Sequence, residues 1–203
     1  MIKDSENPLF IQPLFNFLEQ FHPLSDGFIN YHLKTCRYIH IKKNKFILSP
    51  IENNNSVYFL VKGLVRGFIK LGQKDISTWF GIDNEFISAI RNPNQNSKPS
   101  YEYVQALEDS ELISIPYQNT DFLSHFPETN LISIRLLEIQ YHAAAERAIL
   151  ARIPSAMGRY LRFEGTYLNS NRIPLRYLAT YLGMRLETLS RIRTKSLQLQ
   201  NAI

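Results

Sequence analysis

Hydrophobic positions along the chain follow three successive patterns. Over residues 8–34 apolar side chains recur at helical spacing, and Pro13 and Pro23 interrupt them, which predicts short helices with a break near Pro23. Over residues 37–115, β-branched and aromatic runs alternate with Asn, Gly, Asp and Pro clusters at intervals of about ten residues. After Pro116 the helical spacing returns.

The middle stretch is typical of an all-β unit. Its strand-like runs cover residues 38–41, 46–48, 57–61, 64–69, 76–80 and 103–107. Many short, evenly spaced strands predict a small β-sandwich or barrel-like roll. Lys62-Gly63 between two runs predicts a tight hairpin, and the polar stretch Arg91–Ser100 predicts a loop.

A long helix is predicted from about Thr129, its candidate N-cap, to about Ala151. A helix of this length spans about 33 Å at 1.5 Å per residue. Because it is largely apolar, it needs partners on more than one side, which favours pairing with a second copy of the chain. Burial within a single chain fits the periodicity as well. A further helix is predicted from Ser155 to about Tyr167, with four side chains buried: Met157, Tyr160, Leu161 and Phe163.

The C-terminal stretch has the pattern of a helix-turn-helix. Pro174 suits the first turn of a helix, and Gly183 can take the left-handed conformation that ends it. A second helix then follows, with Leu189 and Ile192 buried at a spacing of three. Two short helices joined by a glycine turn are typical of this DNA-binding motif.

The exposed side of this second helix carries groups that read DNA. They are Glu187, Thr188, Ser190, Arg191 and Lys195, with Arg193 nearby. Glu187 can accept a hydrogen bond from cytosine N4, and Arg191 can reach guanine or a phosphate. Taken singly, Glu187 fits simple helix-dipole complementarity and Arg191 a solvated surface arginine. As a set on one basic helix pair, they favour DNA binding.

Charge is distributed unevenly along the chain. The net charge of +5 divides into −2 over residues 1–128 and +7 over residues 129–203. This asymmetry points to a polyanionic partner at the basic end, although a solvated basic face is the simpler alternative.

Composition narrows the class of protein. With 44% hydrophobic and 20% charged residues, the chain is expected to be globular. No apolar run reaches the roughly 20 residues of a membrane-spanning helix, and the N-terminus lacks the pattern of a secretory signal, so a cytoplasmic location without a membrane partner is expected. The single cysteine, Cys36, excludes an internal disulfide, a CxxC zinc site and an iron–sulfur cluster of usual ligation.

The segments Tyr177-Leu178-Ala179-Thr180-Tyr181-Leu182-Gly183 and Glu187-Thr188-Leu189-Ser190-Arg191 resemble the catabolite-activator/fumarate–nitrate (Crp/Fnr) regulators, and the order of predicted elements matches that family over essentially the whole chain. The resemblance implies an α+β fold. Its parts are a cyclic-nucleotide-binding-like β-roll domain (1–128), a dimerisation helix (129–152) and a helix-turn-helix domain (153–203). It also implies a set of DNA contacts: Arg176, Tyr177, Arg185, Leu186, Glu187, Thr188, Ser190, Arg191, Arg193 and Lys195.

The effector site departs from the family pattern. Cyclic-nucleotide binders of this family hold the phosphate with a Gly-Glu turn and an Arg-Ser pair, but here Ser100 stands at the arginine position and Tyr101 at the serine position. Binding of cyclic AMP is therefore not expected, and the effector stays unassigned. The candidate pocket residues are Glu85, Phe86, Ser88, Ser100 and Tyr101. No cofactor is expected either, because the five histidines form no recognisable haem-ligand pattern.

Two details of the DNA-binding end also differ. The chain stops at Ile203, so the family's β-hairpin wing is expected to be absent or reduced. Arg185 stands where a Ser or Thr cap is usual.

The sequence thus predicts a homodimeric transcription regulator that reads a palindromic DNA site, with RNA polymerase as a candidate further partner. The alternative is a sensor or interaction module with weak or lost sequence-specific DNA binding. An enzyme is not expected, because no nucleophile–base constellation, phosphate-cradling loop or metal-ligand cluster is evident.

Overall fold

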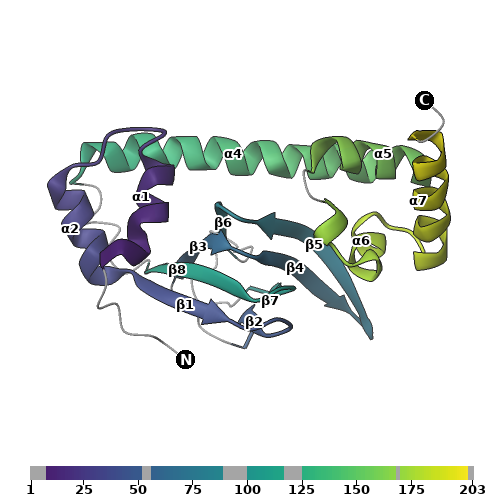
Figure 1. Cartoon of the computed structure of the whole chain (residues 1–203), viewed down its shortest axis with the longest axis horizontal. Coiled ribbons are helices and arrows are strands. Elements are labelled where there is room, and N and C mark those ends of the chain that lie inside the picture. Colours follow the sequence, from purple (N-terminus) through teal and green to yellow (C-terminus); the bar gives the residue numbers. More distant parts are fainter. Residues whose placement is uncertain (1–7, 52–55, 89–99, 117–124, 168–169, 201–203) are drawn as a thin grey trace. The chain divides into compact units, whose positions relative to one another are not determined.

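The computed structural model describes residues 8–51, 56–88, 100–116, 125–167 and 170–200 (Figure 1). Its N-terminal helices are η1 (Pro8–Ile11), α1 (Gln12–Leu18) and α2 (Asp26–Thr35). The strands are β1 (Arg37–Ile41), β2 (Phe46–Leu48), β3 (Ser56–Lys62), β4 (Leu64–Leu71), β5 (Lys74–Ile82), β6 (Glu85–Ile87), β7 (Tyr103–Ala106) and β8 (Ser110–Pro116). The C-terminal helices are α4 (Pro127–Arg152), α5 (Ala156–Thr166), η2 (Ser170–Arg172), α6 (Leu175–Tyr181) and α7 (Leu186–Gln200).

The strands form two four-stranded sheets, in the orders β1-β8-β3-β6 and β2-β7-β4-β5. β8 lies at the centre of the first sheet, where Ile113 pairs with Tyr38 on one side and with Phe59 on the other. The predicted all-β middle is confirmed, and so is the helical break before Asp26. The predicted runs omitted β6 and β8.

The hairpin predicted at Lys62-Gly63 is wrong. β3 and β4 belong to different sheets, so the chain crosses from one sheet to the other at Gly63. Gly63 has φ +131°, and its N–H donates to the Asp83 carboxylate. A Cβ at this position would also collide with the Ser110 side chain. Glycine is required here for a crossover, for the same steric reason that it is common in hairpins.

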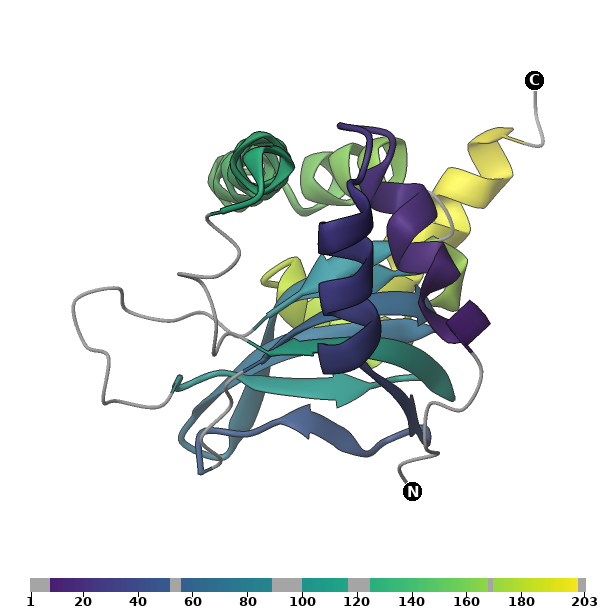
Figure 2. The ribbon, with the colours of Figure 1, turned by 90° about the vertical axis from the view of Figure 1, so that its left-hand side faces the viewer.

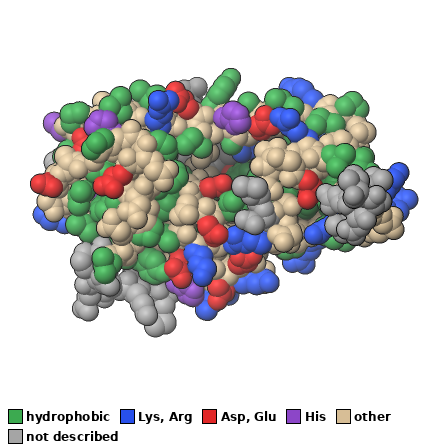
Figure 3. Space-filling view, turned by 45° about the horizontal axis from the view of Figure 1, so that its top comes forward, with side chains coloured by type: hydrophobic (Ala, Val, Ile, Leu, Met, Phe, Trp, Pro, Cys, Tyr) green, Lys and Arg blue, Asp and Glu red, His purple; other side chains and the backbone are tan. Residues whose placement is uncertain are grey.

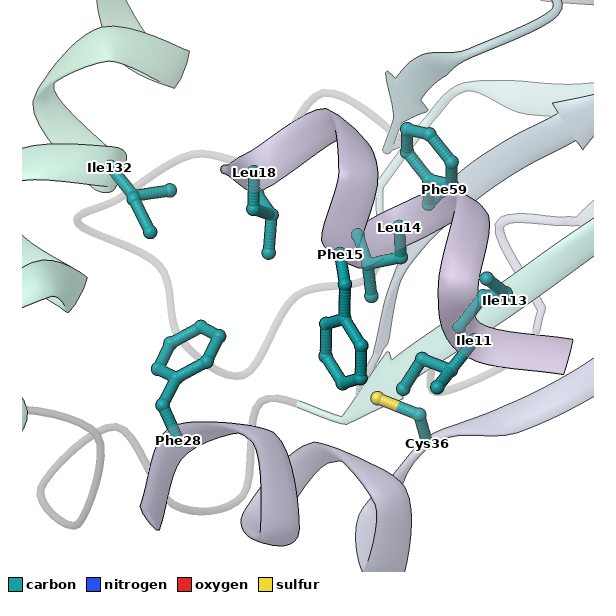
Figure 4. Packing of buried hydrophobic residues seen from close by; sticks show 9 residues of the cluster. All are labelled: Ile11, Leu14, Phe15, Leu18, Phe28, Cys36, Phe59, Ile113 and Ile132. Atoms are coloured by element: carbon teal, nitrogen blue, oxygen red, sulfur yellow. The ribbon is translucent and has the colours of Figure 1, made fainter. Parts of the chain in front are cut away.

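The N-terminal helices close the core at one end of the sheets (Figures 1 and 2). Their buried side chains mix with residues from the strands and from the start of α4 (Figure 4). The cluster consists of Ile11, Leu14, Phe15, Leu18, Phe28, Cys36, Phe59, Ile113 and Ile132. Packing of this apolar surface holds the short helices, which are too short to be stable in isolation.

A serine joins α2 to the start of α4. Ser25 caps α2 by accepting a hydrogen bond from the Phe28 N–H. Its own N–H and hydroxyl donate to Oε1 of Glu128, at 3.0 and 2.5 Å. Because α4 begins at Pro127, Glu128 lies in its first turn, where a carboxylate suits the helix dipole. The N-cap predicted at Thr129 is therefore wrong, since Thr129 already lies inside the helix.

The next helix, α5, largely follows its prediction. Ser155 is its N-cap and accepts from the Gly158 N–H at 3.0 Å. Tyr160 and Phe163 are buried as expected, but Leu161 is 52% exposed. The apolar positions of α5 therefore do not all face one core.

The chain divides into two compact units. The first contains Met1–Gly67 and Phe80–Gln140, and the second contains Phe68–Trp79 and Tyr141–Ile203. The outer part of the β4–β5 hairpin thus groups with the C-terminal helices, and α4 runs through both units.

The loop predicted over Arg91–Ser100 lies, apart from Ser100, outside the described residues.

One buried histidine gives stability a defined pH dependence. His32 is 4% exposed, donates from Nδ1–H to Phe28 O (2.9 Å), and lies among the rings of Phe15, Phe28 and Tyr31. Burial lowers its pKa below the ordinary value. The unfolded chain then binds a proton more readily than the folded chain, so stability is complete above about pH 6.5 and falls as the pH drops toward the folded-state pKa.

We predict that His32→Gln reduces the loss of stability at acid pH. The measurement is the slope of the free energy of unfolding against pH, obtained from urea titrations. The matched control is His142→Gln on the exposed surface of α4, which should keep the wild-type slope. Equal slopes in wild type and H32Q would show that His32 is not the titrating group.

Candidate nucleic-acid interface

The first helix of the C-terminal pair is short and ends in a defined turn. α6 buries Leu178 and Ala179. After it, the Gly183 N–H donates to Thr180 O at 3.3 Å and the Met184 N–H donates to Ala179 O at 3.0 Å. Together with the φ of +62° at Gly183, these two bonds form a Schellman motif. The predicted glycine turn is confirmed.

The second helix, α7, presents a polar face to solvent. Leu189 is fully buried and anchors the helix from within. Glu187, Ser190, Arg191 and Lys195 are exposed. Their spacing of three to four residues places them along one side of the helix. The structure therefore brings the expected acceptor, hydroxyl and cations onto one accessible surface.

The other residues of α7 and the turn before it that were predicted to contact DNA differ in exposure and position. Arg185 is exposed directly before α7, and Leu186 is 43% exposed at its first position. Thr188 and Arg193 are half-buried. Burial raises the pKa of Tyr160 while the charge of Arg193 opposes that shift, which places Arg193 near Tyr160 of α5.

Arg176 and Tyr177 act as a pair at the start of α6. The Arg176 guanidinium lies 4.4 Å from the centre of the Tyr177 ring and donates to the Tyr177 hydroxyl at 2.5 Å. The tyrosine thus orients an exposed cation at one end of the helix pair.

The candidate effector residues are more scattered. The Glu85 carboxylate accepts from the Ile82 N–H at 3.1 Å, and the Ser100 hydroxyl accepts from the Glu102 N–H at 3.0 Å. Phe86 packs against Phe17 and Phe59, with ring centres 5.7 and 5.3 Å apart, so its ring belongs to the core. The other two candidates, Ser88 and Tyr101, are exposed.

Sequence reasoning missed the arginine that holds the helix pair. Arg159 of α5 donates to Leu182 O at 2.7 Å, Ile153 O at 2.9 Å and Pro154 O at 3.1 Å, and it reaches Gly183 O at 3.5 Å. One guanidinium thus ties the turn after α6 to the end of α4. The available signal was a charged side chain directly before a buried Tyr160 on an amphipathic helix.

An aromatic group fixes α6 against α5. Phe163 stacks on Tyr167 with centres 4.5 Å apart, and Tyr181 meets Phe163 edge-on at 5.6 Å. The hydroxyls of Tyr167 and Tyr181 are 3.2 Å apart. Burial and this contact raise the pKa of Tyr181, which keeps its hydroxyl neutral.

Within the described part of the chain, no helix is long and apolar enough to cross a membrane. The same residues contain no group of three or more His, Cys, Asp or Glu side chains arranged to hold a metal ion.

The fold has counterparts among solved structures. A CooA mutant from Carboxydothermus hydrogenoformans is 14% identical, with a TM-score of 0.68, over 98% of this chain and 87% of that one. FixK2 from Bradyrhizobium japonicum is 18% identical, with a TM-score of 0.65, over 82% and 86%. TTHB099 from Thermus thermophilus, described as a transcriptional regulator of the CRP family, is 13% identical, with a TM-score of 0.60, over 80% and 85%.

These likenesses confirm the predicted fold of β-roll, long helix and C-terminal helices. No protein-family model matches the chain, and no curated protein sequence matches it.

The turn geometry makes a stability prediction. Gly183→Ala should destabilise the protein by about 1 kcal/mol, because a side chain is strained at positive φ even though open space surrounds the site. Gly165→Ala, in helical backbone with nothing within 4 Å, should instead be neutral or stabilise by up to about 1 kcal/mol. Denaturant unfolding measures both; a G183A variant as stable as G165A would contradict the assignment of strain to the turn.

Proposed function

We propose that this chain is a DNA-binding transcription regulator of the Crp/Fnr type. The observation that carries the proposal is the α6–α7 pair, whose Schellman turn leaves the polar face of α7 accessible. The fold shared with a CRP-family transcriptional regulator supports it.

In this proposal α7 enters the major groove. Glu187, near its N-terminus, would accept a hydrogen bond from cytosine N4, and Arg191, one turn later, would donate to guanine O6 and N7. Ser190 lies beside them on the exposed face, while the half-buried Thr188 flanks it. Arg176, Arg185 and Lys195 would bind phosphates, which positions the helix without reading sequence. Arg193, which is half-buried, would lie at the edge of this DNA-binding surface.

A second copy of the chain would complete the binding unit through α4. An exposed apolar stripe with heptad spacing follows this helix, at Ile134, Leu137, Tyr141, Ala144, Ala148 and Ala151. Figure 3 shows exposed apolar side chains interspersed with charged and histidine side chains. Leu137 is 68% and Tyr141 79% exposed. Side chains at alternating spacings of three and four form the seam of a two-helix coiled coil. Burial of this seam is the physical reason to expect a homodimer.

A two-fold dimer dictates the form of the DNA site. Two recognition helices related by such an axis reach successive major grooves about 34 Å apart and read a palindrome. The β-roll would then be the sensing part, with residues 1–128, 129–152 and 153–203 as sensor, dimerisation helix and DNA-binding domain. RNA polymerase is the partner on which such a cytoplasmic regulator would act.

The β-roll's effector is proposed to be other than cyclic AMP. A phosphate facing Ser100 and Tyr101 would lack the arginine that pairs with it in cyclic-nucleotide binders. Glu102, which follows, is fully buried and carries the wrong charge for that role. The proposal assigns the chain no catalytic residue.

We predict that Arg191→Ala weakens binding to a specific site by about 1–3 kcal/mol and relaxes preference at one base pair of each half-site. The measurement is selection of bound sequences from random duplexes, followed by salt-titrated gel shifts. The control is Arg135→Ala on α4, which also removes one positive charge but from a residue outside the proposed interface, and should leave affinity within a factor of about two.

A folded protein that binds every duplex equally, with steep salt dependence, would contradict this function. That outcome would favour an interaction module that has lost sequence-specific DNA binding.

The dimer makes a separate prediction. Leu137→Glu should convert the dimer to monomers, because a carboxylate would have to be buried in the apolar seam. Ile139→Glu makes the same change two residues away, on the other side of α4, where the side chain is 46% exposed, and should leave the dimer intact. Sedimentation velocity measures both, and equal effects of the two variants would contradict the heptad seam.

A further inference from the structure

A hollow of about 330 Å³ opens in the second unit, and none of the candidate effector residues lines it. Its volume is at the lower end of the range of small-molecule sites, roughly 300–1,000 Å³. The hollow is lined by Ser77, Thr78, Arg147, Leu150, Ala151, Arg159, Tyr181, Leu182 and Gly183. None of these nine residues is acidic, so two arginines determine its charge.

The two arginines differ in the hydrogen-bond acceptors that the protein gives them. Every hydrogen-bond acceptor that Arg159 has among the described residues is a backbone carbonyl. Arg147 is half-buried, and among the described residues no hydrogen bond joins its guanidinium to an acceptor. Its neighbour on α4, Glu146, is already paired with Arg162 at 2.7 Å. The Arg147 guanidinium is therefore available to an external acceptor, and an anion in the hollow would form charge-assisted hydrogen bonds with it.

The rest of the wall suits a small organic molecule. Leu150 and Leu182 are almost fully buried and supply an apolar side, and Ala151 leaves space. Ser77, Thr78 and Tyr181 are the uncharged polar residues of its lining. Few polar groups on an apolar wall are typical of metabolite sites.

We propose that this hollow binds a small metabolite through a phosphate or carboxylate group held by Arg147 and Arg159. Both guanidinium groups would donate charge-assisted hydrogen bonds, which are roughly twice as strong as bonds to neutral acceptors. The proposal does not depend on DNA binding or on any ligand in the β-roll.

Binding at this site has a direct consequence for the helix pair. The anion would compete with the carbonyls of Leu182 and Gly183 for the Arg159 donors. Occupancy would therefore loosen the connection between the turn after α6 and the end of α4. The site would regulate the orientation of α7 without contacting it.

Nuclear magnetic resonance titrations of the full chain test the site, with inorganic phosphate and acetate as separate probes at constant ionic strength. We expect saturable shifts of the arginine Nε–H signals of Arg147 and Arg159, and the probe that saturates at lower concentration identifies the preferred group. Arg147→Gln should abolish saturation. Arg152→Gln, which removes the same charge from an exposed position on α4, should retain it.

Two results would overturn the proposal. One is a linear, unsaturable shift in wild type, which indicates a general ionic effect. The other is equal saturation in R147Q and wild type. Should R147Q fail to fold by circular dichroism, Arg147→Lys replaces it, and this variant must bind more weakly than wild type because it loses the planar fork. If Arg147 responds while the backbone amides of Gly183 and Met184 do not move, competition for Arg159 is wrong.

Discussion

The arrangement of the C-terminal helices depends on one guanidinium group. The carbonyls of Ile153 and Pro154, directly after the end of α4 at Arg152, accept hydrogen bonds from Arg159. Arg159 supplies donors to that end and to the turn after α6 at the same time. Its planar fork can reach several acceptors in fixed directions, which a lysine ammonium cannot do with one geometry. Arg159 therefore has a structural role. It holds the turn before α7, and this turn sets the orientation of the polar face of α7.

α4 is the second element on which the structure depends, because different sides of this one helix make different contacts. Ile132 enters the core beneath α1 and α2, and Leu150 is buried near the other end. The heptad stripe between them stays exposed, and the first turn is tied to Ser25 through Glu128. A helix with apolar residues on more than one side has little amphipathic contrast, which explains why periodicity alone left its partners open.

The sequence predicted most elements because their signals are local. Short β-branched runs, Pro174 and the Gly183 turn each act within a few residues. β8 was omitted although it is central, because its pairing with both β1 and β3 is a long-range property. Gly63 was interpreted as a hairpin because a crossover and a hairpin need the same backbone freedom. The acceptors of Arg159 could not be foreseen, since they are carbonyls up to 24 residues away that only the folded chain brings together. The face of α7 was foreseen because helical spacing determines it.

The stripe on α4 changes in size along its length, from Ile134, Leu137 and Tyr141 to Ala144, Ala148 and Ala151. Large knobs fix the relative position of two helices, whereas alanines fill only shallow holes and let the axes approach closely. In a pair joined along this stripe, the register would be set at the end nearer α1 and α2, and the alanine end would resist sliding and rotation only weakly. Small rotations about the common axis would therefore cost least at the end from which α5, α6 and α7 continue. The two paired α4 helices would thus resist twisting at one end and permit it at the other.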